Sequence, residues 1–109
     1  MLAVFIFHFN RPDFLENAVR SVERHFPGVA LTIMDDGSTL AAARACLARL
    51  AQTHEVLQPD GARASEAWTG GLHANMTRAL HLAQRRGLRY AVMLQDDMQI
   101  VRPWREQDT

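Results

Sequence analysis

Two adjacent carboxylates, Asp96 and Asp97, directly follow an apolar run and Gln95 in the stretch Tyr-Ala-Val-Met-Leu-Gln-Asp-Asp that begins at position 90. Burying an ionised carboxylate without a partner is costly, so the pair should lie where the run leaves the core and something neutralises its charge. A metal ion, a helix N-terminus or an arginine could do so. The residues that gather around the pair therefore decide which chemistry is available to it.

Polar clusters also follow two earlier apolar runs. His8, Asn10 and Arg11 come after residues 2–7, and Asp35 and Asp36 come after residues 29–34. Each cluster also has a structural interpretation. Asn10 could cap a following helix, and the stretch 35–39 could form a turn and a helix cap, because Asp and Ser side chains accept backbone N–H bonds there.

The elements that must position these clusters alternate along the chain. Apolar runs predict strands at 2–7, 29–34, 55–57 and 90–94, and helical spacing predicts helices over 14–26, 40–50 and 72–86. This alternation indicates an α/β fold with an open, mostly parallel sheet, right-handed crossovers and helices on both faces. Such sheets bind ligands beyond the carboxyl ends of their strands, so we expect the three polar clusters to share one edge.

Length and composition narrow the function classes. The 109 residues form one domain, and twelve acidic residues balance twelve basic ones, which disfavours a nucleic-acid partner. All the basic residues are arginine, so chemistry that needs a lysine amine is excluded. Cys46 is the single cysteine, and the apolar start lacks a basic leader, so we expect a reducing, cytoplasmic location.

Three stretches of the chain resemble the donor-binding half of family 2 glycosyltransferases, which have the Rossmann-like GT-A fold. They are Phe-Asn-Arg-Pro-Asp-Phe-Leu-Glu-Asn-Ala-Val-Arg-Ser-Val (9–22), Thr-Ile-Met-Asp-Asp-Gly-Ser-Thr (32–39) and Met-Leu-Gln-Asp-Asp-Met (93–98). Their order and spacing match the family over nearly the whole chain. The resemblance and the right-handed crossovers together predict the strand order 3-2-1-4.

The resemblance implies that the chain binds a nucleotide sugar, most simply a uridine diphosphate sugar. The segment after the first strand, Phe9 with the neighbouring Asn10 and Arg11, would border the base. Asp35 or Asp36, after the second strand, would hydrogen-bond the uracil or the ribose.

After the fourth strand, Asp96 would contact the ribose and Asp97 would ligate Mn²⁺ or Mg²⁺ on the diphosphate. The cation would neutralise the carboxylate and the departing diphosphate, acting as a Lewis acid. One position departs from the family's motif, and another is placed by the resemblance only approximately. Gln95 stands where the family has the first aspartate of its Asp-x-Asp motif, and Arg63 lies where a diphosphate-binding arginine would fall.

The resemblance also implies that an acceptor-binding half with the catalytic carboxylate would follow Thr109. We therefore expect residues 1–109 to be a single nucleotide-sugar-binding domain that transfers no sugar by itself. The face left by the missing half could support a homo-oligomer, and a longer protein could act at a membrane surface. The alternative is a nucleotide-binding module without catalysis, which an assay of sugar transfer beside nucleotide binding would separate from an enzyme.

Three other classes fit the sequence less well. A phospho-acceptor receiver domain has this length and clustered acids but needs a lysine at a strand end. A phosphatase of the haloacid dehalogenase type would place its nucleophile at Met34. A nucleotidyltransferase would carry a glycine-rich loop with a basic residue after the first strand, and residues 8–11 contain no glycine.

Overall fold

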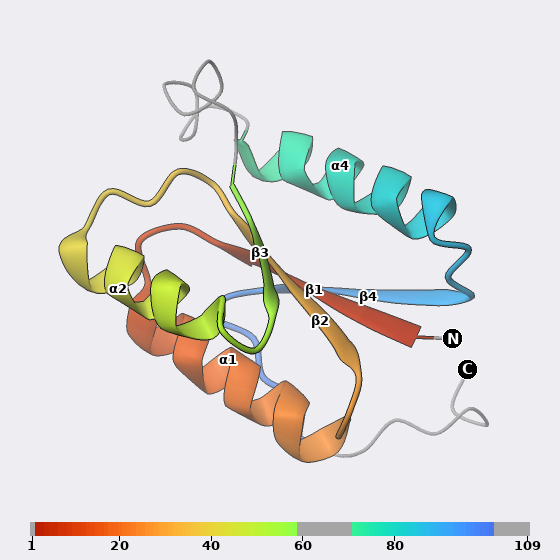
Figure 1. The fold of residues 1–109 in the computed structure, drawn as a ribbon, viewed down its shortest axis with the longest axis horizontal. Helices are drawn as coiled ribbons and strands as arrows, with labels where there is room; N and C mark the ends of the chain where they lie inside the picture. The colour runs from red at the N-terminus through yellow and green to blue at the C-terminus, as the bar shows by residue number, and fades with distance from the viewer. Residues whose placement is uncertain (1, 59–70, 102–109) are drawn as a thin grey trace.

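The computed structural model describes residues 2–58 and 71–101. Within them the chain forms an α/β fold around a four-stranded, wholly parallel sheet in the order β3-β2-β1-β4 (Figure 1). This confirms the predicted fold class and strand order. The elements are β1 (Leu2–His8), α1 (Pro12–His25), β2 (Ala30–Asp35), α2 (Ala41–Leu50), β3 (Glu55–Leu57), α4 (Gly71–Arg85) and β4 (Tyr90–Gln95).

Strand β1 lies at the centre of the sheet, between β2 and β4. Its residues Val4, Phe5 and Ile6 are fully buried, which explains why the strand is a continuous apolar run with no polar alternation. Strands β3 and β4 are the two edges among the described residues. The central strand therefore contributes buried side chains to the clusters on both faces of the sheet.

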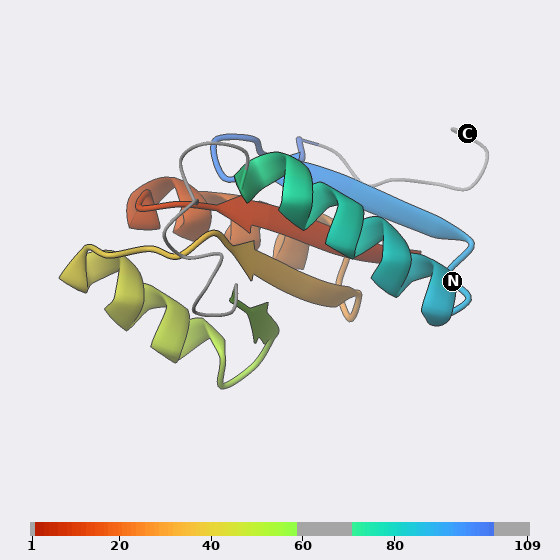
Figure 2. The ribbon, with the colours of Figure 1, turned by 90° about the horizontal axis from the view of Figure 1, so that it is seen from above.

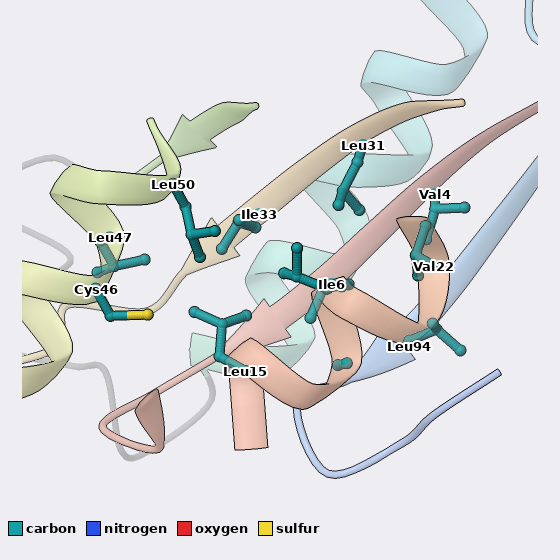
Figure 3. Close-up of a cluster of buried hydrophobic side chains, with 12 residues drawn as sticks. Val4, Ile6, Leu15, Val22, Leu31, Ile33, Cys46, Leu47, Leu50 and Leu94 are labelled. Atoms are coloured by element: carbon teal, nitrogen blue, oxygen red, sulfur yellow. The ribbon is translucent and has the colours of Figure 1, made fainter. Parts of the chain in front are cut away.

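Helices cover both faces of the sheet, as predicted (Figure 2). On the face of α1 and α2, Ile6 and Ile33 from the sheet belong to one cluster with Leu15 and Leu47 from the helices (Figure 3). On the face of α4, Phe5 belongs to a second cluster, in which α4 contributes alanines. Small side chains on α4 let the helix lie close to the sheet.

The element boundaries agree with the prediction to within one residue, except at the start of α1. Helix α1 begins at Pro12 and not at Phe14, because proline fits the first turn of a helix, where its missing N–H has no intrahelical partner. Gly28 and Gly87, which follow α1 and α4, have positive φ angles of 79° and 65°. Glycine adopts this left-handed conformation without a steric cost. No helix within residues 2–58 and 71–101 is long and apolar enough to cross a membrane.

Candidate functional site

The polar clusters that follow β1, β2 and β4 meet at one edge of the sheet. In the parallel register His8 pairs with Asp35, and Phe7 pairs with Gln95, so the three strands end side by side. We call residues 8–11, 35–38 and 95–97 together the carboxyl edge. The predicted convergence of the three clusters is confirmed by this register.

A pocket of about 170 Å³ opens at the carboxyl edge. It is smaller than the roughly 300–1,000 Å³ of a typical small-molecule site, so it matches one ring of a ligand more closely than a whole nucleotide sugar. Four of the predicted binding residues line it: Phe9, Arg11, Asp36 and Asp96. The other lining residues are Phe7, His8, Leu72, Asn75 and Gln95.

Arg11 is the group that lies beside the paired carboxylates. Its Nη1 is 3.7 Å from Asp96 Oδ1 and 3.6 Å from Asp97 Oδ2. The backbone N–H of Phe9 also donates to Asp96 Oδ2 at 3.3 Å. The structure therefore supplies an arginine and a backbone donor where the sequence left the neutralising partner open.

The two carboxylates differ in environment. Asp96 is buried, and this burial raises the pKa of its carboxyl group, although the N–H of Phe9 opposes the shift. The side chain of Asp97 is 47% exposed. Asp96 is thus held in the wall of the pocket, whereas Asp97 is half exposed and is not part of the pocket lining.

The donor chemistry at this edge suits a divalent cation that is shared with a phosphate group. Among the described residues, no three histidine, cysteine or acidic side chains are grouped to hold a metal ion. Asp96 and Asp97 offer hard carboxylate oxygens, and Mg²⁺ is commonly bound by one or two carboxylates together with substrate phosphates. The residues therefore fit a cation whose coordination is completed by a ligand and by water.

Asp35 lies in the interior and does not line the pocket. Its carboxylate accepts hydrogen bonds from His8 Nδ1 at 2.9 Å, Ser38 Oγ at 2.6 Å, Ser38 N at 2.9 Å and Gly37 N at 3.1 Å. The bonds from Gly37 N and Ser38 N agree with the turn that the sequence predicted after the strand. The predicted helix cap in this stretch is wrong, because Leu40 occupies the N-cap position of α2 and there is no side-chain cap bond. Of the two aspartates predicted to meet the ligand, the structure brings Asp36 to the pocket and turns Asp35 inward.

His8 is a site residue whose role sequence reasoning left open. Its Nε2 accepts the backbone N–H of Arg11 at 3.0 Å, which places the ring proton on Nδ1, the atom that faces Asp35. The imidazole is buried and also lines the pocket. It links the interior carboxylate to the segment that carries Arg11. The signal in the sequence was a polar ring at the end of an otherwise apolar strand.

Asn10 holds the end of β1 to the segment before α2. Its Oδ1 accepts the backbone N–H groups of Thr39 at 2.8 Å and Leu40 at 3.0 Å, and its own N–H donates to Ser38 Oγ at 2.9 Å. The idea that Asn10 caps α1 is wrong, because Arg11 occupies that position without a side-chain cap bond. Asn10 therefore organises the edge but is absent from the pocket lining.

Replacing Asn10 by glycine and by alanine distinguishes the stability contributed by its side-chain hydrogen bonds from that contributed by its backbone conformation. The residue has a φ of 52°, which asparagine and glycine tolerate better than alanine. We expect Asn10→Gly to lower the free energy of unfolding by about 1 kcal/mol and Asn10→Ala to lower it by about 2 kcal/mol. Urea denaturation of both variants measures this. Equal losses would show that the left-handed backbone contributes nothing.

Helix α4 contributes Leu72 and Asn75 to the pocket, and sequence reasoning missed both as site residues. Asn75 is 1% exposed, and its Nδ2 lies 3.5 Å from the backbone oxygen of Asp35. The available signal was an amide on the face of the helix that otherwise carries Ala79 and Ala83. Arg63, which the resemblance suggested as a diphosphate partner, lies outside the described residues.

The fold and the site define an α/β protein with a Rossmann-like parallel sheet and a ring-sized pocket at its carboxyl edge. In such sheets this edge is the place where ligands bind. No protein-family model matches the chain, and no curated protein matches it. A function therefore has to be argued from the residues of the edge themselves.

Proposed function

We propose that the chain is the nucleotide-sugar-binding part of a metal-dependent glycosyltransferase that uses a uridine diphosphate sugar. One observation carries this proposal. The pocket at the carboxyl edge is lined by Phe9, Arg11, Asp36 and Asp96, which come from all three sequence stretches that resemble family 2 glycosyltransferases.

The chemistry of the lining suits each part of such a ligand. Phe7 and Phe9 offer aromatic surface for the base. The carboxylates of Asp36 and Asp96 can accept hydrogen bonds from a base N–H or from ribose hydroxyl groups. Arg11 is 53% exposed, so its guanidinium can turn toward a diphosphate without leaving a buried charge behind.

Asp97 is the residue we propose for the cation. Its side chain is half exposed and follows the lining residue Asp96 in the sequence, and its carboxylate would hold Mn²⁺ or Mg²⁺ together with phosphate oxygens. When bound, the cation would supply Lewis-acid stabilisation of the diphosphate leaving group. In the structure Arg11 lies near the carboxylate of Asp97. A cation bound to this carboxylate would replace the arginine there, and the guanidinium could then bind the phosphates.

Removing the charge of Asp97 tests this assignment. We expect uridine diphosphate to bind only with Mn²⁺ or Mg²⁺, and Asp97→Asn to weaken binding by on the order of 2 kcal/mol, about thirtyfold in Kd. Asp96→Asn should cost less, because an amide can still bond a ribose hydroxyl. Isothermal titration calorimetry with and without each metal measures both effects.

Glu23→Gln is the matched control, because Glu23 pairs with His54 and lies outside the pocket lining. Its affinity for uridine diphosphate should equal that of the unmodified chain. Metal-independent binding, or an unaffected Asp97→Asn variant, would mean that the paired aspartates end the strand for structural reasons. Absence of uridine diphosphate binding under every condition would overturn the proposed function itself.

A further inference from the structure

The ring of His8 joins the interior of the protein to the pocket at the carboxyl edge. Its side chain is fully buried, and both of its nitrogens have partners. Nδ1 donates to Asp35 Oδ1 at 2.9 Å, and Nε2 accepts the backbone N–H of Arg11 at 3.0 Å. A neutral imidazole has one donor and one acceptor nitrogen. The ring can therefore keep both bonds only while it is neutral.

The bond from Arg11 to the ring fixes residues 9–11, the segment that carries two side chains of the pocket. Phe9 and Arg11 both line the pocket. The N–H of Phe9 donates to Asp96 at 3.3 Å, and the guanidinium of Arg11 lies 3.7 Å from the same carboxylate and 3.6 Å from Asp97. The place of these groups at the pocket thus depends on a segment whose last N–H is held by His8.

A second proton on the ring would turn Nε2 from an acceptor into a donor. Two N–H groups would then face each other across the 3.0 Å between His8 Nε2 and the nitrogen of Arg11, and the bond would be lost. We propose that His8 is a proton-dependent positioning residue: its neutral ring holds residues 9–11 in the arrangement that binds ligand, and its protonated ring releases them. Where this concerns uridine diphosphate, it rests on the proposed function.

The charged groups that face the ring come from three strand ends. Carboxylates follow β2 and β4 and would stabilise a charged ring: Asp35, Asp36 and Asp96. The guanidinium of Arg11 and the burial of the ring oppose that charge. Helix α4 adds only Leu72 and Asn75 to the lining, and neither is ionisable. Variants of His8 therefore have to separate its protonation from that of the carboxylates.

Two amide substitutions separate the two bonds of the ring. In His8→Gln the side-chain oxygen can reach the Nε2 position and accept the N–H of Arg11 without titrating. In His8→Asn the shorter amide reaches only the Nδ1 position, beside Asp35. We expect His8→Gln to bind uridine diphosphate with Mn²⁺ about tenfold more tightly than His8→Asn at neutral pH, because one hydrogen bond to the segment differs. Isothermal titration calorimetry measures both affinities.

The pH profile gives a readout that a merely structural role would not change. From about pH 8 to about pH 5, where histidine can change charge, the Kd of the unmodified chain should rise at least about fivefold more than that of His8→Gln. Protonation of Asp96 and of the diphosphate acts on both proteins. His54→Gln is the matched control, because His54 pairs with Glu23 outside the pocket lining, and its profile should equal that of the unmodified chain. Parallel profiles for the unmodified chain and His8→Gln would overturn the role of His8.

NMR of the isotope-labelled, unmodified chain tests the same role without a variant or a ligand. A scalar coupling between the amide nitrogen of Arg11 and Nε2 of His8 should be present while the ring is neutral. It should vanish as the ring takes up a second proton, and the amide signal of Phe9 should shift with the same midpoint. A Phe9 signal that ignores the ring would contradict the role of His8 and leave the proposed function standing. Signals that follow the ring in a chain that never binds uridine diphosphate would support the role of His8 and overturn the proposed function.

Discussion

Asp35→Ala should lower the free energy of unfolding by about 4 kcal/mol. The fully buried carboxylate accepts bonds from His8, Gly37 and Ser38, and truncation leaves these buried or partly buried donors without their acceptor. Since domains of this size are stable by about 5–15 kcal/mol, the loss is a large part of the total. Chemical denaturation measures it. Asp97→Ala, the same change at a half-exposed position of the same edge, should cost less than about 1 kcal/mol.

The stability of the protein at acid pH should also depend on Asp35. Burial alone would raise the pKa of its carboxyl group, but hydrogen bonds from His8 and Ser38 hold the pKa below the ordinary value. A lowered pKa in the folded state means that this stabilisation is present above the ordinary pKa of aspartate and is lost as the pH falls through the folded value.

Asp35→Asn should therefore be less stable than the unmodified chain at neutral pH, and the difference should shrink as the pH falls through this acid range. The raised pKa of Asp96 acts in the opposite direction, because its buried carboxylate gains from protonation as the pH falls. Denaturation of Asp35→Asn across that range measures the difference. A difference that does not change with pH would contradict the role assigned to the Asp35 carboxylate.

Phe5→Ala should destabilise the protein by about 4 kcal/mol. Phe5 is fully buried in the central strand and belongs to the cluster beneath α4, so truncation would leave a cavity between the sheet and that helix. Thermal and urea unfolding measure the loss. Phe14→Ala makes the same change at a side chain that is 52% exposed and should cost less than about 1 kcal/mol.

Phe5→Ala should also weaken ligand binding in the pocket. Helix α4 carries Leu72 and Asn75 into the pocket lining, and its position depends on the cluster around Phe5. Weakened uridine diphosphate binding by a Phe5→Ala chain that is still folded would agree with the proposed function. A stability close to that of Phe14→Ala would contradict the central place of Phe5 in the core.

The strands and their shared edge could be predicted from the sequence, because the strands follow from local hydrophobic patterns and the edge follows from how the strands are connected. The apolar runs at 2–7 and 90–94 have no polar alternation, which is the pattern of strands covered on both faces. Parallel strands joined by helices then require the three polar clusters to meet, whatever their distance along the chain. The strand order needed the family resemblance as well, since alternation alone allows more than one arrangement.

Which polar groups face inward could not be read from local patterns. Asp35 and Asp36 are neighbours of the same type, yet one is enclosed by His8 and Ser38 and the other lines the pocket. The alternation of side chains along a strand puts them on different sides, but the partners that decide burial come from β1 and from the segment before α2. Likewise, Asn10 bonds Thr39 across 29 positions of sequence.

The amino-acid sequence by itself determined the element types, the parallel architecture and the edge where polar groups collect, because hydrophobic periodicity and strand connectivity are local or topological properties. Only the tertiary structure decided that Arg11 lies between Asp96 and Asp97, that His8 links the interior to the edge, and that α4 supplies Asn75. These contacts join segments from different elements, and their distances depend on how the helices pack on the sheet.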